Sequence, residues 1–152
     1  MPAVIRLFCL SVLVMPLGVQ ATSLEEVFRD FRKCNFEGFY YAPWDPQQKV
    51  HPYLAERNLT PYKEVSGLYY FKVKDTLFGL PVAEIIIPGT WNLHAAVFDA
   101  PLAKTQRALK RRFGSVFAPS ALSAEGKVPA LEIAVENPSR SALYCNEVEG
   151  GE

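Results

Sequence analysis

The chain has 152 residues with 16 basic and 16 acidic side chains, so its formal net charge is zero. A balanced charge creates no long-range field that would attract nucleic acid, and we expect no nucleic-acid partner. The length suits a single domain that can bury its own core.

Residues 1–21 have the order of a secretory signal peptide. Arg6 supplies the positive charge, an apolar run extends from Leu7 to Val14, and small residues precede Ala21. The apolar run is shorter than the roughly 20 residues that span a bilayer. We therefore expect cleavage after Ala21, a periplasmic or secreted location, one domain over residues 22–152 and no stable membrane span. An uncleaved anchor helix is the alternative.

The cysteines fit an exported protein. Cys9 leaves with the signal peptide, so Cys34 and Cys145 remain as a single pair in an oxidising compartment. We predict a disulfide between them, which would stabilise the fold by about 4–5 kcal/mol in the chain-entropy model. Two buried free thiols are the alternative.

The first predicted element is a helix that begins at a capping box. Ser23 is the expected N-cap, and Glu26 stands at the third helical position. A single apolar stripe follows, formed by Leu24, Val27, Phe28 and Phe31. We expect this helix to continue to about Lys33.

The segment Asn35–Ser66 is rich in both aromatic residues and prolines. The prolines rule out a long helix or a central strand, which leaves a short strand at Phe36–Tyr41, a helical turn at Pro52–Arg57 and otherwise ordered loop. Long loops are often functional, so we expect a binding surface here. The rings expected to be exposed are Trp44, Tyr53 and Tyr62; the alternative is that most rings of the segment cover the sheet.

Strands dominate from Gly67 onward. We predict a strand at Leu68–Lys74, a turn or bulge near Gly79, and a hairpin in which Val82–Ile87 pairs with Trp91–Phe98 through a Pro88–Gly89 turn. The hairpin is the most apolar stretch after the signal peptide and forms the base of the fold. His94, on its second strand, is expected on the less buried face.

A second helix is predicted from Pro101, capped by Asp99 or Ala100, and it ends at Gly114. Its apolar face comprises Leu102, Thr105, Leu109 and Phe113, and its basic face comprises Lys104, Arg107, Lys110, Arg111 and Arg112. The basic face is either a docking surface or simply solvated.

Two strands, at Leu131–Glu136 and Arg140–Val148, complete the chain. The fold class is therefore α+β: a mostly antiparallel sheet of about five strands, two helices packed on one face and one disulfide. A barrel-like closure of the sheet is the alternative.

The sequence contains no catalytic or metal-binding pattern. Its two histidines, His51 and His94, lack partners at the spacing that zinc requires, and no phosphate-binding glycine motif occurs. We therefore expect no enzymatic activity, no metal and no cofactor.

The leading functional hypothesis is a small exported binding protein that occludes a protein partner, such as a cell-envelope hydrolase, as inhibitors and immunity proteins do. The alternative is a module that binds glycan, such as cell-wall glycan, or a small ligand through loop 35–66. The predicted binding residues are Trp44, His51, Tyr53, Tyr62, Lys104, Arg107 and Arg111.

Overall fold

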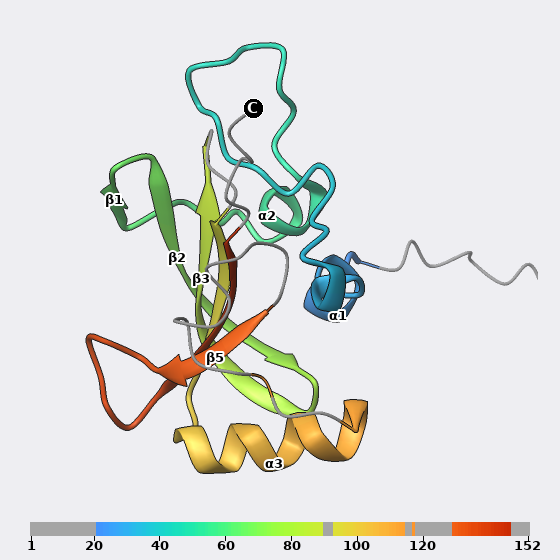
Figure 1. Cartoon of the computed structure of the whole chain (residues 1–152). Helices are drawn as coiled ribbons and strands as arrows, with labels where there is room; N and C mark the ends of the chain where they lie inside the picture. The colour runs from blue at the N-terminus through green and yellow to red at the C-terminus, as the bar shows by residue number, and fades with distance from the viewer. Residues whose placement is uncertain (1–20, 90–92, 115–116, 118–128, 147–152) are drawn as a thin grey trace, which may run out of the picture.

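The computed structural model describes residues 21–89, 93–114, 117 and 129–146 (Figure 1). The predicted signal peptide, most of the loop between residues 115 and 128 and the end of the last predicted strand lie outside these residues, so the predictions for them stay predictions. The elements in chain order are α1 (Leu24–Val27), the 3₁₀ turn η1 (Phe31–Lys33), α2 (Pro52–Glu56), β1 (Lys63–Val65), β2 (Leu68–Leu77), β3 (Leu80–Pro88), β4 (Leu93–Phe98), α3 (Leu102–Phe113), β5 (Ala130–Ile133) and β6 (Ser141–Asn146).

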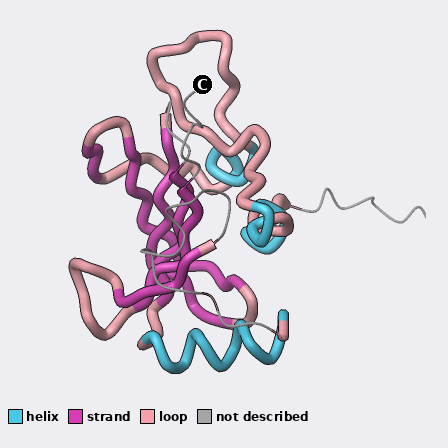
Figure 2. The backbone as a smooth tube through the Cα atoms, viewed as in Figure 1, coloured by secondary structure: helices cyan, strands magenta, loops and turns pink. Residues whose placement is uncertain are grey.

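The six strands form one antiparallel sheet in the order β1-β2-β3-β4-β6-β5. Figure 2 shows this sheet as a single layer, with α1 and α2 on one side and α3 across one end. The α+β class is confirmed, and the strand that the sequence did not reveal is the short edge strand β1. In the described part of the chain, no helix is long and apolar enough to cross a membrane.

Two tight turns set the register of the first three strands. Ser66 and Gly67 have φ of 51° and 76°, and Phe78 and Gly79 have φ of 54° and 76°. Two consecutive residues with positive φ define a type I′ turn, whose twist matches that of the strands it joins. The predicted turn near Gly79 is confirmed as this two-residue hairpin.

The predicted pairing of the two apolar strands is confirmed, because β3 and β4 pair antiparallel, but the turn predicted at Pro88–Gly89 is wrong, since β3 continues through Pro88 and Gly89 does not have a positive φ. Pro88 is the last residue of β3, and residues 90–92 at the tip lie outside the described residues. The two strands lie near the centre of the sheet and form the base against which the aromatic segment packs.

The first helix is shorter than predicted. Ser23 caps it as expected, since its Oγ accepts from the Glu26 N–H at 3.1 Å, but α1 ends at Val27 and η1 follows after a turn. A 3₁₀-like path brings side chains three residues apart onto one side. Phe28 and Phe31 are consequently both buried in the core.

The predicted disulfide is confirmed between Cys34 and Cys145, whose Cα atoms lie 5.4 Å apart across a separation of 111 residues. Cys34 caps η1 in the left-handed region, and Cys145 lies on β6. The bond therefore fastens the N-terminal segment to the last strand.

The aromatic segment is mostly core. Phe36, Phe39 and Tyr53 are buried, and Phe39 makes edge-to-face contacts with Phe28 and Tyr53. The predicted strand at Phe36–Tyr41 does not form; a turn with Gly38 at positive φ replaces it. The predicted helical turn is confirmed as α2.

The expected exposure of His94 is wrong. The side chain is 3% exposed, stacks on Phe36 at 4.4 Å, and lies with Nε2 2.7 Å from the carbonyl oxygen of Phe39. Because a carbonyl only accepts, the Nε2–H donates. Burial lowers the pKa of His94 to about 4, against a smaller opposing effect of the Phe39 hydrogen bond. The segment Phe36–Phe39 folds over the face of β4 that the sequence pattern marked as outward.

The second helix forms close to its predicted bounds, with Pro101 rather than Asp99 or Ala100 as N-cap and Gly114 as C-cap. Thr105 and Leu109 are buried on its inner face, as the stripe predicts. The Thr105 and Ser141 hydroxyls lie 2.7 Å apart, joining α3 to β6.

Candidate functional site

An open trough of about 1500 Å³ runs along the face of the sheet that α1 and α2 leave uncovered. Its floor comes from outward positions of β2 and β3, namely Tyr70, Lys72, Lys74, Glu84 and Ile86. Its walls come from the segment before β1 and from the loop after β5, including Tyr62, Val135 and Glu136. Pockets for small molecules commonly measure about 300–1,000 Å³, so this space has room for a segment of a polymer.

Side chains from opposite edges of the sheet meet across the trough. Lys63 of β1 forms an ion pair with Glu136 of the loop after β5, although β1 and β5 are the two edge strands. In the described residues no backbone pairing joins these strands, so the sheet curves toward closure without forming a barrel. Figure 1 shows β1 and the loop after β5 projecting on the side of the sheet away from α1 and α2.

The trough tyrosines carry lysine ammonium groups over their rings. Lys72 Nζ lies 4.7 Å from the ring centre of Tyr62, and Lys63 Nζ lies 4.7 Å from that of Tyr70. The Tyr62 hydroxyl donates a hydrogen bond to Glu84. These contacts fix both rings, and each ring already has a cation on one face.

Each acidic group of the trough contacts a partner within the protein, whereas neither of its two lysines has an ion-pair partner among the described residues. Four carboxylates line it, and each has a partner: Asp75 with Arg57, Glu84 with Tyr62, Asp99 with Arg140 and Glu136 with Lys63. Within the described part of the chain, no carboxylate lies within ion-pair distance of Lys72 or Lys74. Lys72 and Lys74 thus have no ion-pair partner, while Glu84, which accepts a hydrogen bond from a neutral phenol, keeps its own charge opposite Lys72 on the neighbouring strand.

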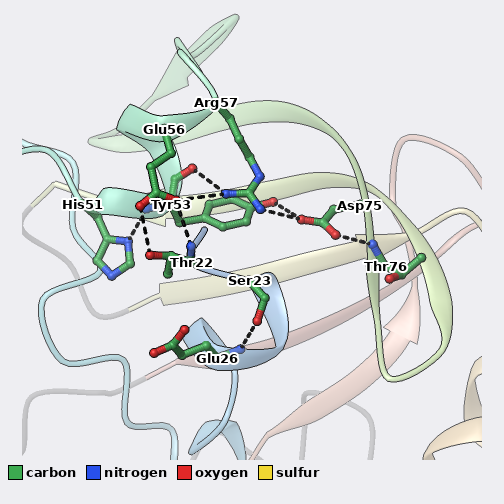
Figure 3. A network of polar contacts seen from close by, with 9 residues as sticks. All are labelled: Thr22, Ser23, Glu26, His51, Tyr53, Glu56, Arg57, Asp75 and Thr76. Atoms are coloured by element: carbon green, nitrogen blue, oxygen red, sulfur yellow. Dashed lines mark hydrogen bonds and ion pairs between the residues drawn. The ribbon is translucent and has the colours of Figure 1, made fainter. Parts of the chain in front are cut away.

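A polar network closes one end of the trough (Figure 3). The Tyr53 hydroxyl donates to Asp75 at 3.0 Å, and the Arg57 guanidinium lies 4.1 Å from the Tyr53 ring centre and 3.7 Å from the Asp75 carboxylate. Thr76 N–H donates to the same carboxylate at 2.7 Å. The network ties α2 to the C-terminal part of β2, just after the point where the pairing with β3 is irregular between Lys72 and Asp75.

Two of the three phenols that line the trough, those of Tyr53 and Tyr62, stay protonated at neutral pH. Burial raises the pKa of Tyr53, with further contributions from the hydrogen bond and charge of Asp75. Burial and the hydrogen bond to Glu84 likewise raise the pKa of Tyr62. The two side chains therefore act as hydrogen-bond donors and not as bases. Among the described residues, no group of three His, Cys, Asp or Glu side chains is placed to hold a metal ion.

His51 has a local structural role. Its Nδ1 accepts from the Tyr53 N–H at 3.2 Å and so caps α2, while its ring packs edge-on against Phe39. Burial lowers the pKa of His51, opposed by the charges of Glu26 and Glu56. His51 borders a separate, smaller pocket of about 260 Å³ and does not line the trough.

The structure separates the predicted binding residues. Tyr62 and Trp44 are 45% and 54% exposed, but the expected exposure of Tyr53 is wrong because its ring lies in the core. The Trp44 ring rests on Tyr69 and on Gly89, where an added Cβ would lie 2.3 Å from Trp44 Cη2. Only Tyr53 and Tyr62 of the predicted set line the trough.

The basic residues predicted to bind, Lys104, Arg107 and Arg111, lie exposed on α3. No residue of α3 lines the trough or the smaller pocket. The basic face and the trough are therefore separate surfaces.

Sequence reasoning missed the other trough residues. Lys72 belongs to the weak alternation of β2, in which Leu68, Tyr70 and Lys72 share a face, and that signal marks the outer face of the sheet. The predicted strand Leu131–Glu136 would place Val135 on the same face as the buried Leu131. In the structure β5 ends at Ile133, Val135 lies in the following turn, and its side chain is 93% exposed.

No protein-family description matches this chain, and no curated protein or solved structure matches it either. The functional argument therefore rests on the geometry of the trough and of α3.

Proposed function

We propose that this is an exported, non-catalytic binding protein that holds an extended segment of a partner protein in the trough. The partner is an exported protein, such as a cell-envelope hydrolase, and binding occludes it. The observation that carries the proposal is the open trough itself, whose volume exceeds that of common small-molecule pockets.

The chemistry of the lining favours a peptide with an acidic side chain. Ile86 and Val135 offer apolar contact, and Tyr62 and Tyr70 are of the residue type enriched at protein interfaces. Three of the four trough carboxylates are in ion pairs and neither Lys72 nor Lys74 is, so these two ammonium groups can bind an added negative charge.

Site-specific photo-crosslinking in the exported fraction of the source cells tests the proposal. A photoreactive phenylalanine at Val135, inside the trough, is compared with one at Val65, an exposed valine on β1 that does not line it. We expect a discrete crosslinked partner from position 135 and none from position 65.

A charge-reversal variant of the trough tests whether binding of the partner depends on Lys72 and Lys74. Lys72→Glu with Lys74→Glu should abolish the crosslink from position 135, because it places two negative charges opposite the acidic partner. Equal crosslinking from positions 65 and 135, or crosslinking that survives the charge reversal, would contradict the proposal.

The glycan alternative rests on the exposure of Trp44. Sugar rings stack on bare aromatic faces, and part of the Trp44 ring is already in contact with Gly89 and Tyr69. With the other tryptophan, Trp91, changed to Phe, the fluorescence reports Trp44 alone. A saturable change during titration with cell-wall fragments would favour the glycan alternative over the protein partner.

A further inference from the structure

The basic face of α3 is the most concentrated charge on the molecule. The helix has the sequence LAKTQRALKRRF, with five basic and no acidic residues, in a chain whose basic and acidic residues balance. Arg112 pairs with Glu25 at 2.8 Å and lies over the Phe78 ring. The four remaining cations are exposed and, among the described residues, have no carboxylate partner: Lys104, Arg107, Lys110 and Arg111.

Helix energetics explain only part of this charge. Cations in the last turn interact favourably with the helix dipole, which accounts for Lys110 and Arg111. Lys104 stands in the first turn, where the dipole disfavours a cation, and Arg107 has cations three and four residues further on at Lys110 and Arg111. The sequence thus retains positive charge where it destabilises the isolated helix.

We propose that the basic face of α3 docks the protein on an anionic phospholipid surface. The exposed face has no large apolar side chain among the described residues, so it lacks the apolar centre typical of a protein interface. It also borders neither pocket, and α3 lies across one end of the molecule, where a flat surface can approach it (Figure 1). A bilayer with acidic headgroups offers dense negative charge and requires neither a pocket nor an apolar core.

The contact is electrostatic and reversible. The balanced charge of the whole chain gives little long-range attraction to the lipid. The basic face of α3 therefore determines which side of the protein faces the bilayer. Added salt should release the protein, because exposed charges are screened within about 8 Å at physiological ionic strength.

Cosedimentation with vesicles tests the docking. The exported form of the protein is mixed with vesicles of phosphatidylglycerol and phosphatidylcholine in equal parts, or of phosphatidylcholine alone, at low salt and at 0.5 M salt. We expect binding only to the anionic vesicles and release at 0.5 M salt.

Two charge-matched variants locate the contact. Lys104→Glu with Arg107→Glu should lower the partitioning by roughly thirty-fold or more. A carboxylate at position 104 interacts favourably with the dipole at the N-terminus of α3, so we expect this variant to keep its fold. Lys72→Glu with Lys74→Glu makes the same change in net charge within the trough and should leave most of the binding intact.

The outcomes separate this proposal from its competitors. Equal losses in the two variants would show an effect of net charge alone and would overturn the docking face. The protein could instead fail to bind anionic vesicles but bind polyglutamate, with the α3 variant losing that binding. This result would overturn the lipid proposal and show that the basic face binds an acidic protein. The crosslink from position 135 serves as an independent readout, so failure of the trough proposal leaves this result interpretable.

Discussion

Acidification should destabilise the fold through His94. The imidazole is enclosed by Phe36, Phe39 and Tyr40, and its Nε2–H donates to a backbone carbonyl. Burial is the main cause that lowers its pKa, and no carboxylate of the described residues is among the causes. A proton added to this ring in the folded state would place an uncompensated charge in an aromatic core.

The sign and size of the effect follow from the pKa of His94, which falls from 6.5 to about 4 on folding. The unfolded chain binds the proton first as the pH falls, so the free energy of unfolding decreases with falling pH. The contribution is fully present above pH 6.5 and is lost progressively down to about pH 4. A difference of one pKa unit corresponds to 1.36 kcal/mol, which gives a loss of about 3 kcal/mol.

Urea unfolding between pH 7 and pH 4.5 measures this loss, with His94→Gln as the comparison. The Gln amide can donate to the Phe39 carbonyl but does not titrate. We expect the variant to be less stable at pH 7 and the gap from wild type to narrow by about 2–3 kcal/mol at pH 4.5. His51→Asn keeps a good capping residue on α2 and removes the second imidazole as a control. A constant gap across this range, or a His94 NMR titration near pH 6.5, would refute the reasoning.

Two further predictions concern the links between distant segments. Replacing Cys34 and Cys145 by Ala opens a loop of 111 residues. This change should lower the free energy of unfolding by about 5 kcal/mol and Tm by on the order of 15 °C in thermal unfolding. A decrease in Tm below about 3 °C would show that the disulfide does not stabilise the fold through loop entropy. Tyr53→Phe should lower the free energy of unfolding in urea by about 1–2 kcal/mol, because it removes a partly buried hydrogen bond to Asp75. Tyr62→Phe should change the free energy of unfolding little, because its hydrogen bond to Glu84 is exposed. Equal costs would contradict this ranking by burial.

Local patterns predicted the parts of the fold that depend on near neighbours. The Ser23 cap, the apolar stripe of α3 and the turn at Gly79 all express preferences within a few residues. The disulfide also followed from the sequence, because the predicted removal of the signal peptide leaves Cys34 and Cys145 as a single pair.

These local patterns did not predict which side chains are buried by segments distant in the sequence. His94 and Tyr53 were expected to be exposed because their nearest neighbours gave no reason for burial. In the fold, the Phe36–Phe39 turn covers His94, and Tyr53 enters the core between that turn and β2. Both contacts depend on how a loop without regular structure packs, which hydrophobic periodicity does not encode.

The trough likewise required long-range information. Its walls meet through Lys63 and Glu136, which are 73 residues apart in the chain. The alternation of β2 placed Lys72 on one face with Tyr70, but it did not show which face is outward or which loop lies opposite. The basic face of α3, in contrast, is predicted directly from the helix period, and the fold adds that, among the described residues, four of its five cations have no carboxylate partner while Arg112 pairs with Glu25.

Lys72 and Lys74 also have a structural explanation, which the charge-reversal design separates from binding. In the described residues, β1 pairs only with Leu68–Tyr70, so the rest of β2 has a strand partner on one side alone. Lysines and an irregular ladder at such an edge discourage pairing with other chains. Glutamate preserves this protection because it is also charged, whereas it reverses the attraction to an acidic partner. A soluble, monomeric Lys72→Glu, Lys74→Glu protein that loses its crosslink would therefore assign the lysines to binding, and one that keeps the crosslink would assign them to edge protection.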